Sequence, residues 1–590
     1  MQKKIVECVP NFSEGRDMGI IKQITDVIEA VDGVKLLDVD PGAATNRTVV
    51  TFVGEPEPVM EAAFLATQKA AELIDMRQHH GEHPRSGATD VCPFIPIANV
   101  TMEECAQYAR TVARRIGEEL GIPVYCYEAA AFTPERENLA FCRTGEYEGI
   151  QKKLQDPYWK PDFGPAEFSE RVARAGITNV GARDFLVAIN YNLNTTSTRR
   201  ANAIAFDVRE KGRKMREGGS LLGKVLLDEN GEERWLPGTL KGCKAIGWYI
   251  DEYGIAQVSM NVTNISVTPV HVAFDEVCAK AQARGIRVTG AEIVGLIPKK
   301  VLIDAGKYYL AKQQRSAGIA EEEIIKIAVK SMGLDDLKPF NPREKVIEYM
   351  LEDSAAEGAP KKLVDFTCKG FALETASESP APGGGSISAY AGALGAALGT
   401  MVANLSGHKP GWDDKWKYFS DWAEQGQAIV SELLYLVDED TAAFNKIMAC
   451  FGMPKETPEE KAARSAALQE ATIYATQVPL RTMKASYSAF PLIEAMAKDG
   501  NPNSVSDAGV GALCIRTAVH GAYLNVKINA SGIKDRTIAD AILSEAAEIV
   551  ALTDAKEKEI LEEYLLLISL NLSQYTEEDE SGKPILLKKG

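Results

Sequence analysis

Three of the six histidines in this chain, His79, His80 and His83, lie within a stretch of five residues. Imidazole titrates near neutral pH, so such a cluster suits proton transfer or metal binding. The spacing of the first and last histidine is that of two zinc ligands on a helix, but Gly81 and Pro84 would interrupt that helix. We therefore expect general acid–base catalysis by one of these histidines and no metal site, with a solvated loop as the alternative.

A second polar cluster spans residues 37–48, between two predicted strands. Sites built on sheets gather at strand ends, so this position favours function. Asp40 can orient a histidine and stabilise its charged form, and Arg47 can bind a carboxylate through two guanidinium nitrogens. The alternative is the ordinary turn chemistry of Asp, Gly and Asn.

Residues 382–386 read Pro-Gly-Gly-Gly-Ser and precede a predicted helix over residues 387–405. Bare backbone N–H groups at such a helix start can bind an anion. No Gly-Lys-Ser/Thr follows and no strand precedes, which excludes a Walker A motif and a dinucleotide fingerprint. A close-packed bend is the alternative.

Asp440 lies in the apolar stripe of one predicted helix. The stripe consists of Leu433, Val437, Asp440, Phe444, Ile447 and Met448. A carboxyl on a buried face tends to have a raised pKa and can act as an acid or base. Asp438 and Glu439 point away from this stripe and are expected in solvent. A structural, partnered Asp440 is the alternative.

Asn525 and Asn529 stand four residues apart on one face of another predicted helix. Their side-chain amides can form hydrogen bonds with a polar heterocycle. Hydrogen bonding between buried helices is the alternative.

The first third of the chain alternates strand and helix signals. Strands are predicted at residues 4–9, 34–40, 48–53 and 94–100, and helices at 20–31, 56–74 and 101–121. Thr101 and Glu104 form a capping box at the start of the third helix. The order β-α-β-β-α-β is that of a ferredoxin-like sheet with helices on one face.

A second α/β subdomain begins near Phe185, with strands expected at residues 186–192, 245–250 and 256–262 and helices from about residues 270, 300 and 321. Strand patterns end at a small, polar linker that closes with Pro360. Thr457, Pro458 and Glu460 mark a helix start beyond it. The expected fold class is an α+β N-terminal half of two ferredoxin-like α/β subdomains, joined by a short linker to an all-α helical bundle. The expected boundaries are 1–185 and 186–351 for the subdomains, 352–361 for the linker, 362–575 for the bundle and 576–590 for a tail.

Composition restricts the partners. Acidic residues number 83 and basic residues 66, for a net charge of −17, which disfavours nucleic acid and anionic membranes. The ten cysteines show no CxxC spacing, which fits a reducing compartment. No apolar run is expected to reach the ~18 residues of a membrane span, and the N-terminus lacks a signal segment. We expect a cytoplasmic protein.

The motifs resemble those of two enzymes. Residues 6–15, 37–48, 81–85 and 90–96 resemble glutamate formimidoyltransferase, and residues 382–386, 436–440 and 457–461 resemble formimidoyltetrahydrofolate cyclodeaminase. Their order is similar to that of the bifunctional formimidoyltransferase-cyclodeaminase family, over almost the whole chain.

This resemblance implies two reactions of histidine degradation. The formimidoyl group passes from N-formimidoyl-L-glutamate to N5 of tetrahydrofolate. The resulting 5-formimidoyltetrahydrofolate cyclises to 5,10-methenyltetrahydrofolate with release of ammonia. The resemblance places the transferase histidine at His83 and the cyclodeaminase aspartate at Asp440. A methenyltetrahydrofolate cyclohydrolase-like helical domain is the alternative.

The resemblance also implies tetrahydrofolate, in polyglutamylated form, as co-substrate, no metal, and a homo-oligomer built as a ring of dimers. Folate-binding candidates are Gly164, Pro165, Phe168 and Gly176, together with Gly383, Gly384, Gly385 and Ser386. The chain departs from the family pattern between Phe168 and Gly176. It also carries an apparent insertion at residues 214–237.

Overall fold

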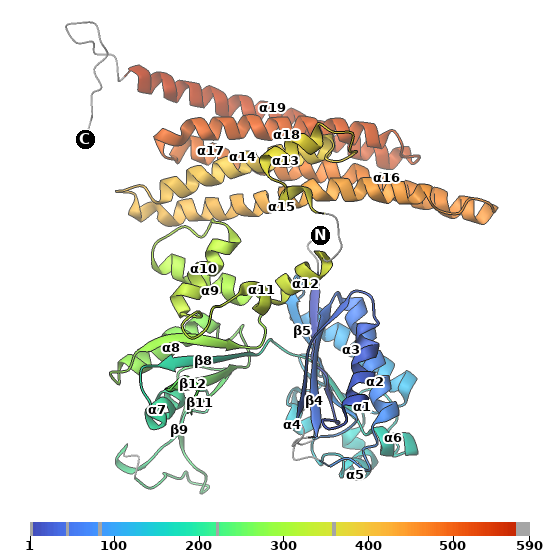
Figure 1. Ribbon diagram of the computed structural model, residues 1–590, viewed down its shortest axis with the longest axis vertical. Coiled ribbons are helices and arrows are strands. Elements are labelled where there is room, and N and C mark those ends of the chain that lie inside the picture. The colour runs from blue at the N-terminus through green and yellow to red at the C-terminus, as the bar shows by residue number, and fades with distance from the viewer. Residues whose placement is uncertain (1–3, 43–45, 81–84, 220–222, 357–360, 574–590) are drawn as a thin grey trace. The chain divides into compact units, whose positions relative to one another are not determined.

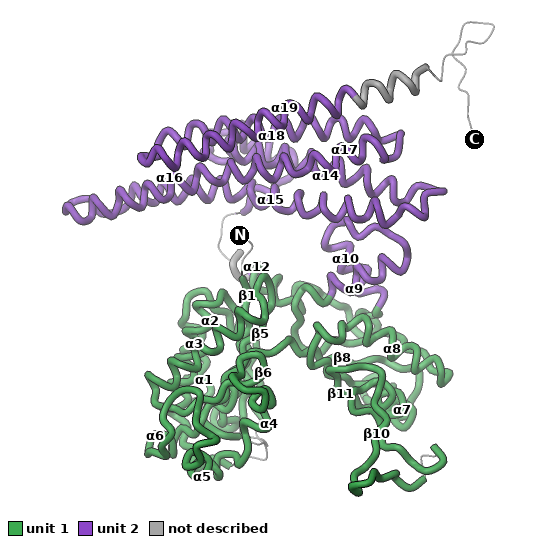
Figure 2. The backbone as a smooth tube through the Cα atoms, turned by 180° about the vertical axis from the view of Figure 1, so that it is seen from behind, with its two compact units in different colours: residues 1–301, 332–352 green, residues 302–331, 353–590 purple. Residues whose placement is uncertain are grey.

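A computed structural model describes residues 4–42, 46–80, 85–219, 223–356 and 361–573 (Figure 1). The chain divides into two compact units (Figure 2). Unit 1 comprises Met1–Val301 with Met332–Glu352, and unit 2 comprises Leu302–Ser331 with Asp353–Gly590. Unit 1 is mixed α/β and unit 2 is helical, so the predicted fold class is confirmed.

A seven-stranded mixed sheet forms the N-terminal part of unit 1. Its strands are β1 (Ile5–Cys8), β2 (Asn11–Phe12), β3 (Val34–Gly42), β4 (Arg47–Gly54), β5 (Thr89–Ala98), β6 (Val124–Glu128) and β7 (Thr178–Ala182). The spatial order is β1-β4-β2-β5-β7-β6, with β3 beside β4. Strands β5, β7 and β6 run parallel, and the other pairs are antiparallel. The predicted ferredoxin-like pattern is therefore extended by β2, β6 and β7.

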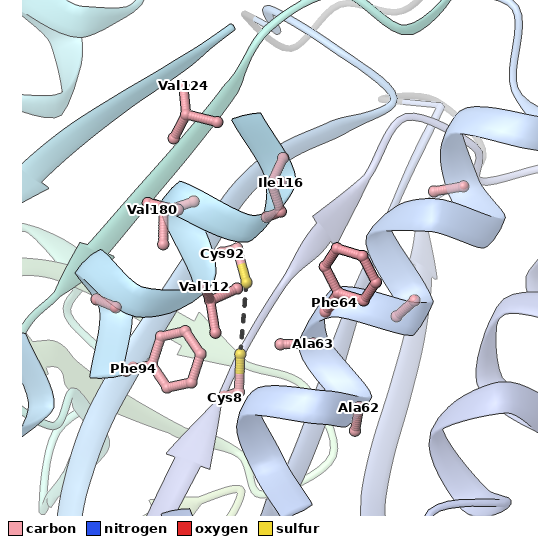
Figure 3. Close-up of a cluster of buried hydrophobic side chains, with 14 of the residues drawn as sticks. Cys8, Ala62, Ala63, Phe64, Cys92, Phe94, Val112, Ile116, Val124 and Val180 are labelled. Atoms are coloured by element: carbon pink, nitrogen blue, oxygen red, sulfur yellow. Dashed lines mark hydrogen bonds between the residues drawn. The ribbon is translucent and has the colours of Figure 1, made fainter. Parts of the chain in front are cut away.

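Three helices cover one face of this sheet (Figure 1). They are α1 (Met18–Glu29), α2 (Pro56–Leu73) and α3 (Met102–Leu120), and the predicted capping box starts α3. Short helices α4 (Leu139–Cys142), α5 (Ile150–Gln155) and α6 (Glu170–Ala175) follow. The core between helices and sheet is apolar and contains two thiols, Cys8 and Cys92, whose Sγ atoms lie 3.6 Å apart (Figure 3).

A four-stranded antiparallel sheet forms the second part of unit 1, in the order β11-β12-β8-β13. Its strands are β8 (Val187–Leu193), β11 (Cys243–Ile250), β12 (Ile255–Val262) and β13 (Val288–Val294), accompanied by α7 (Thr198–Val208), α8 (Val270–Gln282), α11 (Pro342–Lys345) and α12 (Ile347–Ala356). Strand β13 was not predicted. The apparent insertion is closed by β9 (Arg213–Lys214) pairing with β10 (Trp235–Leu236).

Unit 2 is a bundle of long helices. They are α9 (Lys299–Lys312), α10 (Glu321–Met332), α13 (Cys368–Thr375), α14 (Gly384–Gly407), α15 (Trp416–Phe451), α16 (Pro458–Tyr487), α17 (Phe490–Asp499), α18 (Val505–Ala530) and α19 (Arg536–Ser573). The predicted capping box of Thr457 and Glu460 starts α16. Because α14 is rich in Gly and Ala, neighbouring helices pack closely against it.

Helix α14 corrects one expectation from the sequence. It is long and apolar enough to cross a membrane, with a mean hydropathy of 1.3 over its most apolar window. However, 61% of that window is buried inside the protein. Core helices of soluble proteins share this property, so α14 is weak evidence for a membrane span.

Candidate functional sites

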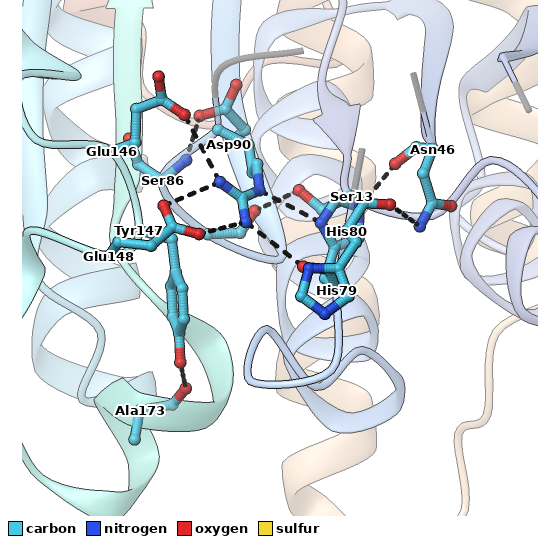
Figure 4. Close-up of polar contacts among 12 residues, drawn as sticks. Ser13, Asn46, His79, His80, Ser86, Asp90, Glu146, Tyr147, Glu148 and Ala173 are labelled. Carbon is cyan, nitrogen blue, oxygen red and sulfur yellow. Dashed lines mark hydrogen bonds and ion pairs between the residues drawn. The ribbon is translucent and has the colours of Figure 1, made fainter. Parts of the chain in front are cut away.

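His79 is fixed in the N-terminal sheet domain by two hydrogen bonds. Its Nε2 lies 2.7 Å from the carbonyl oxygen of Asn46, and its Nδ1 accepts from Arg85 Nε at 3.3 Å (Figure 4). These contacts require the Nε2–H tautomer. Burial lowers the pKa of His79, and the neighbouring Arg85 lowers it further. Both ring nitrogens are occupied, so His79 is held as a neutral structural imidazole.

Asn46 joins three segments at this point. Its Oδ1 accepts from the Gly15 N–H at 3.0 Å, and its Nδ2 donates to the carbonyl oxygen of His80 at 3.1 Å (Figure 4). The His80 side chain is exposed. His83 lies outside the residues that the structure describes.

A buried charge cluster lies beside the histidines. The largely buried Arg85 binds the exposed Glu148 at 2.6 Å, and Asp90, which is 1% exposed, accepts from the Ser86 N–H at 2.9 Å (Figure 4). Asp90 also binds Arg143 at 2.5 Å. Sequence reasoning assigned no role to these residues. The available signal was Asp90 itself, a charge at the start of an otherwise apolar strand.

The two predicted supporting residues lie on adjacent strands. Asp40 is exposed on β3, and no hydrogen bond joins it to a histidine among the described residues. Arg47 is half-buried on β4. Burial lowers the pKa of Arg47 and nearby Arg143 lowers it further, whereas Asp90 acts in the opposite direction. Arg47 thus belongs to the charge cluster around Asp90.

The predicted folate segment touches this site at one end only. Gly176 packs on the backbone of Ser86 and Gly87 so closely that a methyl group there would overlap it. Gly164 packs instead on Ile122, beyond the end of α3. Pro165 is half-buried, and Phe168 is exposed. The two glycines are thus required by close packing.

In unit 2, the predicted glycine turn and the predicted aspartate meet. Asp440 on α15 accepts hydrogen bonds from the Ser386 N–H at 2.9 Å and from Ser386 Oγ at 3.1 Å. Gly383, the N-cap of α14, has no side chain, so Asp440 acts as the acceptor at this helix start. Gly385 packs against the carboxyl, and a side chain there would overlap it.

The environment of Asp440 perturbs its titration. Burial raises the pKa of Asp440, and the hydrogen bonds from Ser386 partly oppose this. The result is a carboxyl that holds its proton to higher pH than an exposed aspartate does. The arrangement suits proton transfer to a group bound at the glycine turn.

A cavity of about 480 Å³ lies beside the same turn, between α14 and α18. It is lined by Gly384, Ile387, Ser388, Ala391, Thr517, Gly521, Leu524, Asn525 and Ile528. Asn525 lies against Gly384, whereas Asn529 donates to the carbonyl oxygen of Ala475. Of the predicted amide pair, Asn525 therefore lines the cavity and Asn529 links two helices.

Two details of the predicted α15 stripe are wrong. Leu433 and Val437 are fully buried, but Phe444 and Met448 are exposed, because the covered face of this part of the helix is the one that carries Ala443 and Cys450. Asp438 and Glu439 are not in solvent either. Asp438 is half-buried and accepts from the Leu363 N–H at 2.7 Å. Glu439 accepts from the phenols of Tyr435 and Tyr474. Both neighbours of Asp440 have structural partners.

Among the residues described, no group of three His, Cys, Asp or Glu side chains is arranged to hold a metal ion.

Three sequence models match the chain. They are the formiminotransferase domain, N-terminal subdomain, at residues 5–183, the formiminotransferase domain at residues 188–352, and formiminotransferase-cyclodeaminase at residues 367–548. The formimidoyltransferase-cyclodeaminase of Mus musculus is 42% identical over 90% of this chain and 93% of its own length. The chain belongs to the formimidoyltransferase-cyclodeaminase family. It is a bifunctional folate enzyme with both transferase and cyclodeaminase activity.

Two further relatives of this formimidoyltransferase-cyclodeaminase carry single activities. The glutamate formimidoyltransferase of Streptococcus pyogenes is 43% identical over 52% of this chain and 93% of its own length. The methenyltetrahydrofolate cyclohydrolase of Methylorubrum extorquens is 38% identical over 33% of this chain and 94% of its own length. The chain thus combines segments similar to independent enzymes.

Proposed function

We propose that the chain performs both reactions with two separate proton-transfer groups, His83 in the transferase part and Asp440 in the helical part. The observation that carries this proposal is the meeting of Asp440 with Ser386 and Gly385 at the start of α14. It occurs in a chain that is 42% identical to a named two-activity enzyme over 90% of its length.

Formimidoyl transfer moves an amidine carbon from the amine of glutamate to N5 of tetrahydrofolate. N5 attacks that carbon and loses a proton, and the departing amine gains one. One group that titrates near neutrality serves both steps. Both ring nitrogens of His79 are already engaged in hydrogen bonds, which favours a neighbouring histidine for this role. The family resemblance selects His83. Asp40 and Arg47 are proposed as supporting residues because of their residue types and their place in the polar segment 37–48.

Cyclodeamination joins N10 to the same carbon and releases its nitrogen as ammonia. N10 loses a proton in the attack, and the leaving nitrogen must be protonated. Asp440 is suited to both transfers because burial raises its pKa and Ser386 fixes one of its oxygens. The cavity beside Gly384 and Asn525 is the proposed site for the pterin part of the substrate.

The folate is proposed to carry a polyglutamate tail. Lysine and arginine side chains near both pockets are proposed to attract its carboxylates locally, despite the net charge of −17. Gly164, Pro165, Phe168 and Gly176 remain proposed folate contacts.

The second candidate function for the helical part is hydrolysis of methenyltetrahydrofolate, which is favoured by its 38% identical relative. A coupled assay separates the two. With formimidoylglutamate and tetrahydrofolate supplied, cyclodeamination yields methenyl absorbance and ammonia together. A cyclohydrolase would consume supplied methenyltetrahydrofolate and release no ammonia.

A homo-oligomer, specifically a ring of dimers, is proposed as the working assembly, and the cytoplasm as its location. Exposed apolar side chains on α14 and α18 support the first point: Ile387, Leu394, Met401, Leu405, Val510, Leu513, Leu524 and Ile528. Such a surface favours association with a second copy.

A further inference from the structure

Residues 302–331, here called the α9–α10 hairpin, lie in the sequence range of the formiminotransferase domain. Nevertheless they belong to the compact helical unit (Figure 2). Leu310, Ala317 and Ile324 form a buried apolar cluster within the hairpin. The hairpin is continuous at both ends with the chain of unit 1. One enzyme thus contributes a segment to the packed fold of the other.

The turn of the hairpin is fixed against α14 and α15. The Ala317 N–H donates to Ser420 Oγ at 3.0 Å, in a buried position. The carbonyl oxygen of Gly318 accepts from Asn404 Nδ2 at 2.7 Å. Gly318 lies so close to Ala423 that a methyl group on Gly318 would overlap the Ala423 backbone. Close packing and hydrogen bonds shielded from water make this contact specific.

An ion pair adds a second attachment. Lys307 Nζ lies 2.8 Å from Glu424 Oε2, and Ser420 Oγ donates to the other carboxylate oxygen of Glu424 at 3.3 Å. The side chains of Lys307 and Glu424 are both partly exposed, so this pair alone is weak. Through Ser420, however, it is linked to the buried bond at Ala317.

We infer that the α9–α10 hairpin, rather than the short segment near residue 357, holds the two enzymes of this chain together. The partner that fits it is the surface of α14 and α15 around Asn404, Ser420 and Ala423. Its role is to keep the transferase attached to the deaminase, independently of the chemistry of either site. Cutting the chain between residues 357 and 360 should therefore leave the two fragments bound.

The test introduces a specific protease site at residues 357–360 of the full chain and cuts the folded protein. Complete cleavage is checked on a denaturing gel. Size-exclusion chromatography should then show both fragments in one peak, with both activities retained. Fragments that elute separately at micromolar concentration would overturn the inference.

Variants locate the contact. Gly318→Ala should weaken fragment association about tenfold or more, because its methyl group has no space. Gly452→Ala, whose methyl group would make only ordinary contacts, should have no effect. Lys307→Glu should weaken association roughly fivefold, and Lys307→Glu with Glu424→Lys should restore it. Restored association in the double variant would also show that Lys307→Glu alone does not act by misfolding the protein. Association that survives Gly318→Ala and Lys307→Glu unchanged would overturn the inference.

Discussion

At the scale of a single residue, the carboxyl of Asp440 has two roles, one toward the start of α14 and one toward a bound substrate. One oxygen accepts from both the backbone and the side chain of Ser386 and thereby completes the N-terminus of α14. The raised pKa allows the same carboxyl to exchange a proton with a bound substrate. A structural role and a catalytic role of Asp440 are therefore compatible. Measuring both stability and ammonia release shows how much each role contributes.

Asp440→Asn should abolish ammonia release and leave formimidoyl transfer intact. The amide oxygen still accepts from Ser386, so the loss of stability should stay near 1 kcal/mol. Asp438→Asn is the matched control, because Asp438 lies on the same helix and accepts from Leu363. Melting temperature, ammonia and transfer are measured on one preparation. Retained ammonia release at a lowered melting temperature would exclude Asp440 as the acid–base group.

His83→Ala should reduce formimidoyl transfer by about 10²–10⁴-fold, the usual contribution of a general acid–base group. Deamination of supplied 5-formimidoyltetrahydrofolate should continue. His80→Ala serves as control because the His80 side chain is exposed. Transfer by His83→Ala within about tenfold of the unmodified rate contradicts the assignment.

Glu7 should make the stability of the transferase part depend on pH. Its side chain is 4% exposed on β1, and burial raises its pKa from 4.5 to about 7. The folded state therefore favours the protonated form. This contribution is fully present below pH 4.5 and is lost as pH rises through about 7, at a cost on the order of 3 kcal/mol.

Denaturant unfolding at pH 5 and pH 8 checks this dependence on Glu7. Glu7→Gln should remove most of the loss at pH 8, whereas the exposed control Glu29→Gln should retain it. An unchanged difference between the two pH values in Glu7→Gln would show that another group is responsible.

At the scale of elements, the glycine turn before α14 depends on two adjacent glycines with different surroundings. A methyl group on Gly385 would overlap the Asp440 carboxyl, whereas one on Gly384 would lie 3.4 Å from Asn525. Gly385→Ala should therefore abolish deamination, and Gly384→Ala, which leaves the carboxyl of Asp440 in place but narrows the cavity beside Asn525, should reduce it less. Ammonia release by the two variants, with circular dichroism as a check on folding, tests this. Equal losses would argue against a special role for the Asp440 contact.

Local signals in the sequence predicted the elements that depend on local chemistry. The capping boxes at Thr101 and Thr457 start α3 and α16 as expected. The parallel pairing of β5, β7 and β6 was missed because it joins strands distant in the chain. Strand β13 was missed because Gly290 and Glu292 interrupt its pattern. Periodicity placed Phe444 on the covered face of α15, whereas the structure buries Ala443 and Cys450 there.

The candidate sites were predictable to a similar extent. Asp440 and the glycine turn were both recognised, but their contact joins residues 54 positions apart and required the fold. The structural role of His79 depends on the carbonyl oxygen of Asn46. Every residue has a backbone carbonyl, so the sequence does not indicate which one accepts this hydrogen bond. The charge cluster around Asp90 is similarly formed by segments distant in sequence.

At the scale of the whole molecule, the exposed apolar side chains of α14 and α18 should determine assembly. Leu524→Glu places a charge on a residue that is 67% exposed and should shift the protein to smaller species. Leu373→Glu, on α13 at 61% exposure, is the matched control. Sedimentation velocity distinguishes them. An unchanged assembly in Leu524→Glu would place the interface elsewhere.

The neighbouring thiols of Cys8 and Cys92 also allow local opening of the transferase core to be measured. Both are fully buried, Cys8 on β1 and Cys92 on β5 (Figure 3), whereas Cys368 is exposed at the start of α13. A thiol-specific reagent should label Cys368 at once and reach the buried pair only when the transferase sheet opens. The rate of this slow labelling, to which the buried Cys105 and Cys126 of the same core also contribute, therefore reports how often the core opens in the intact chain.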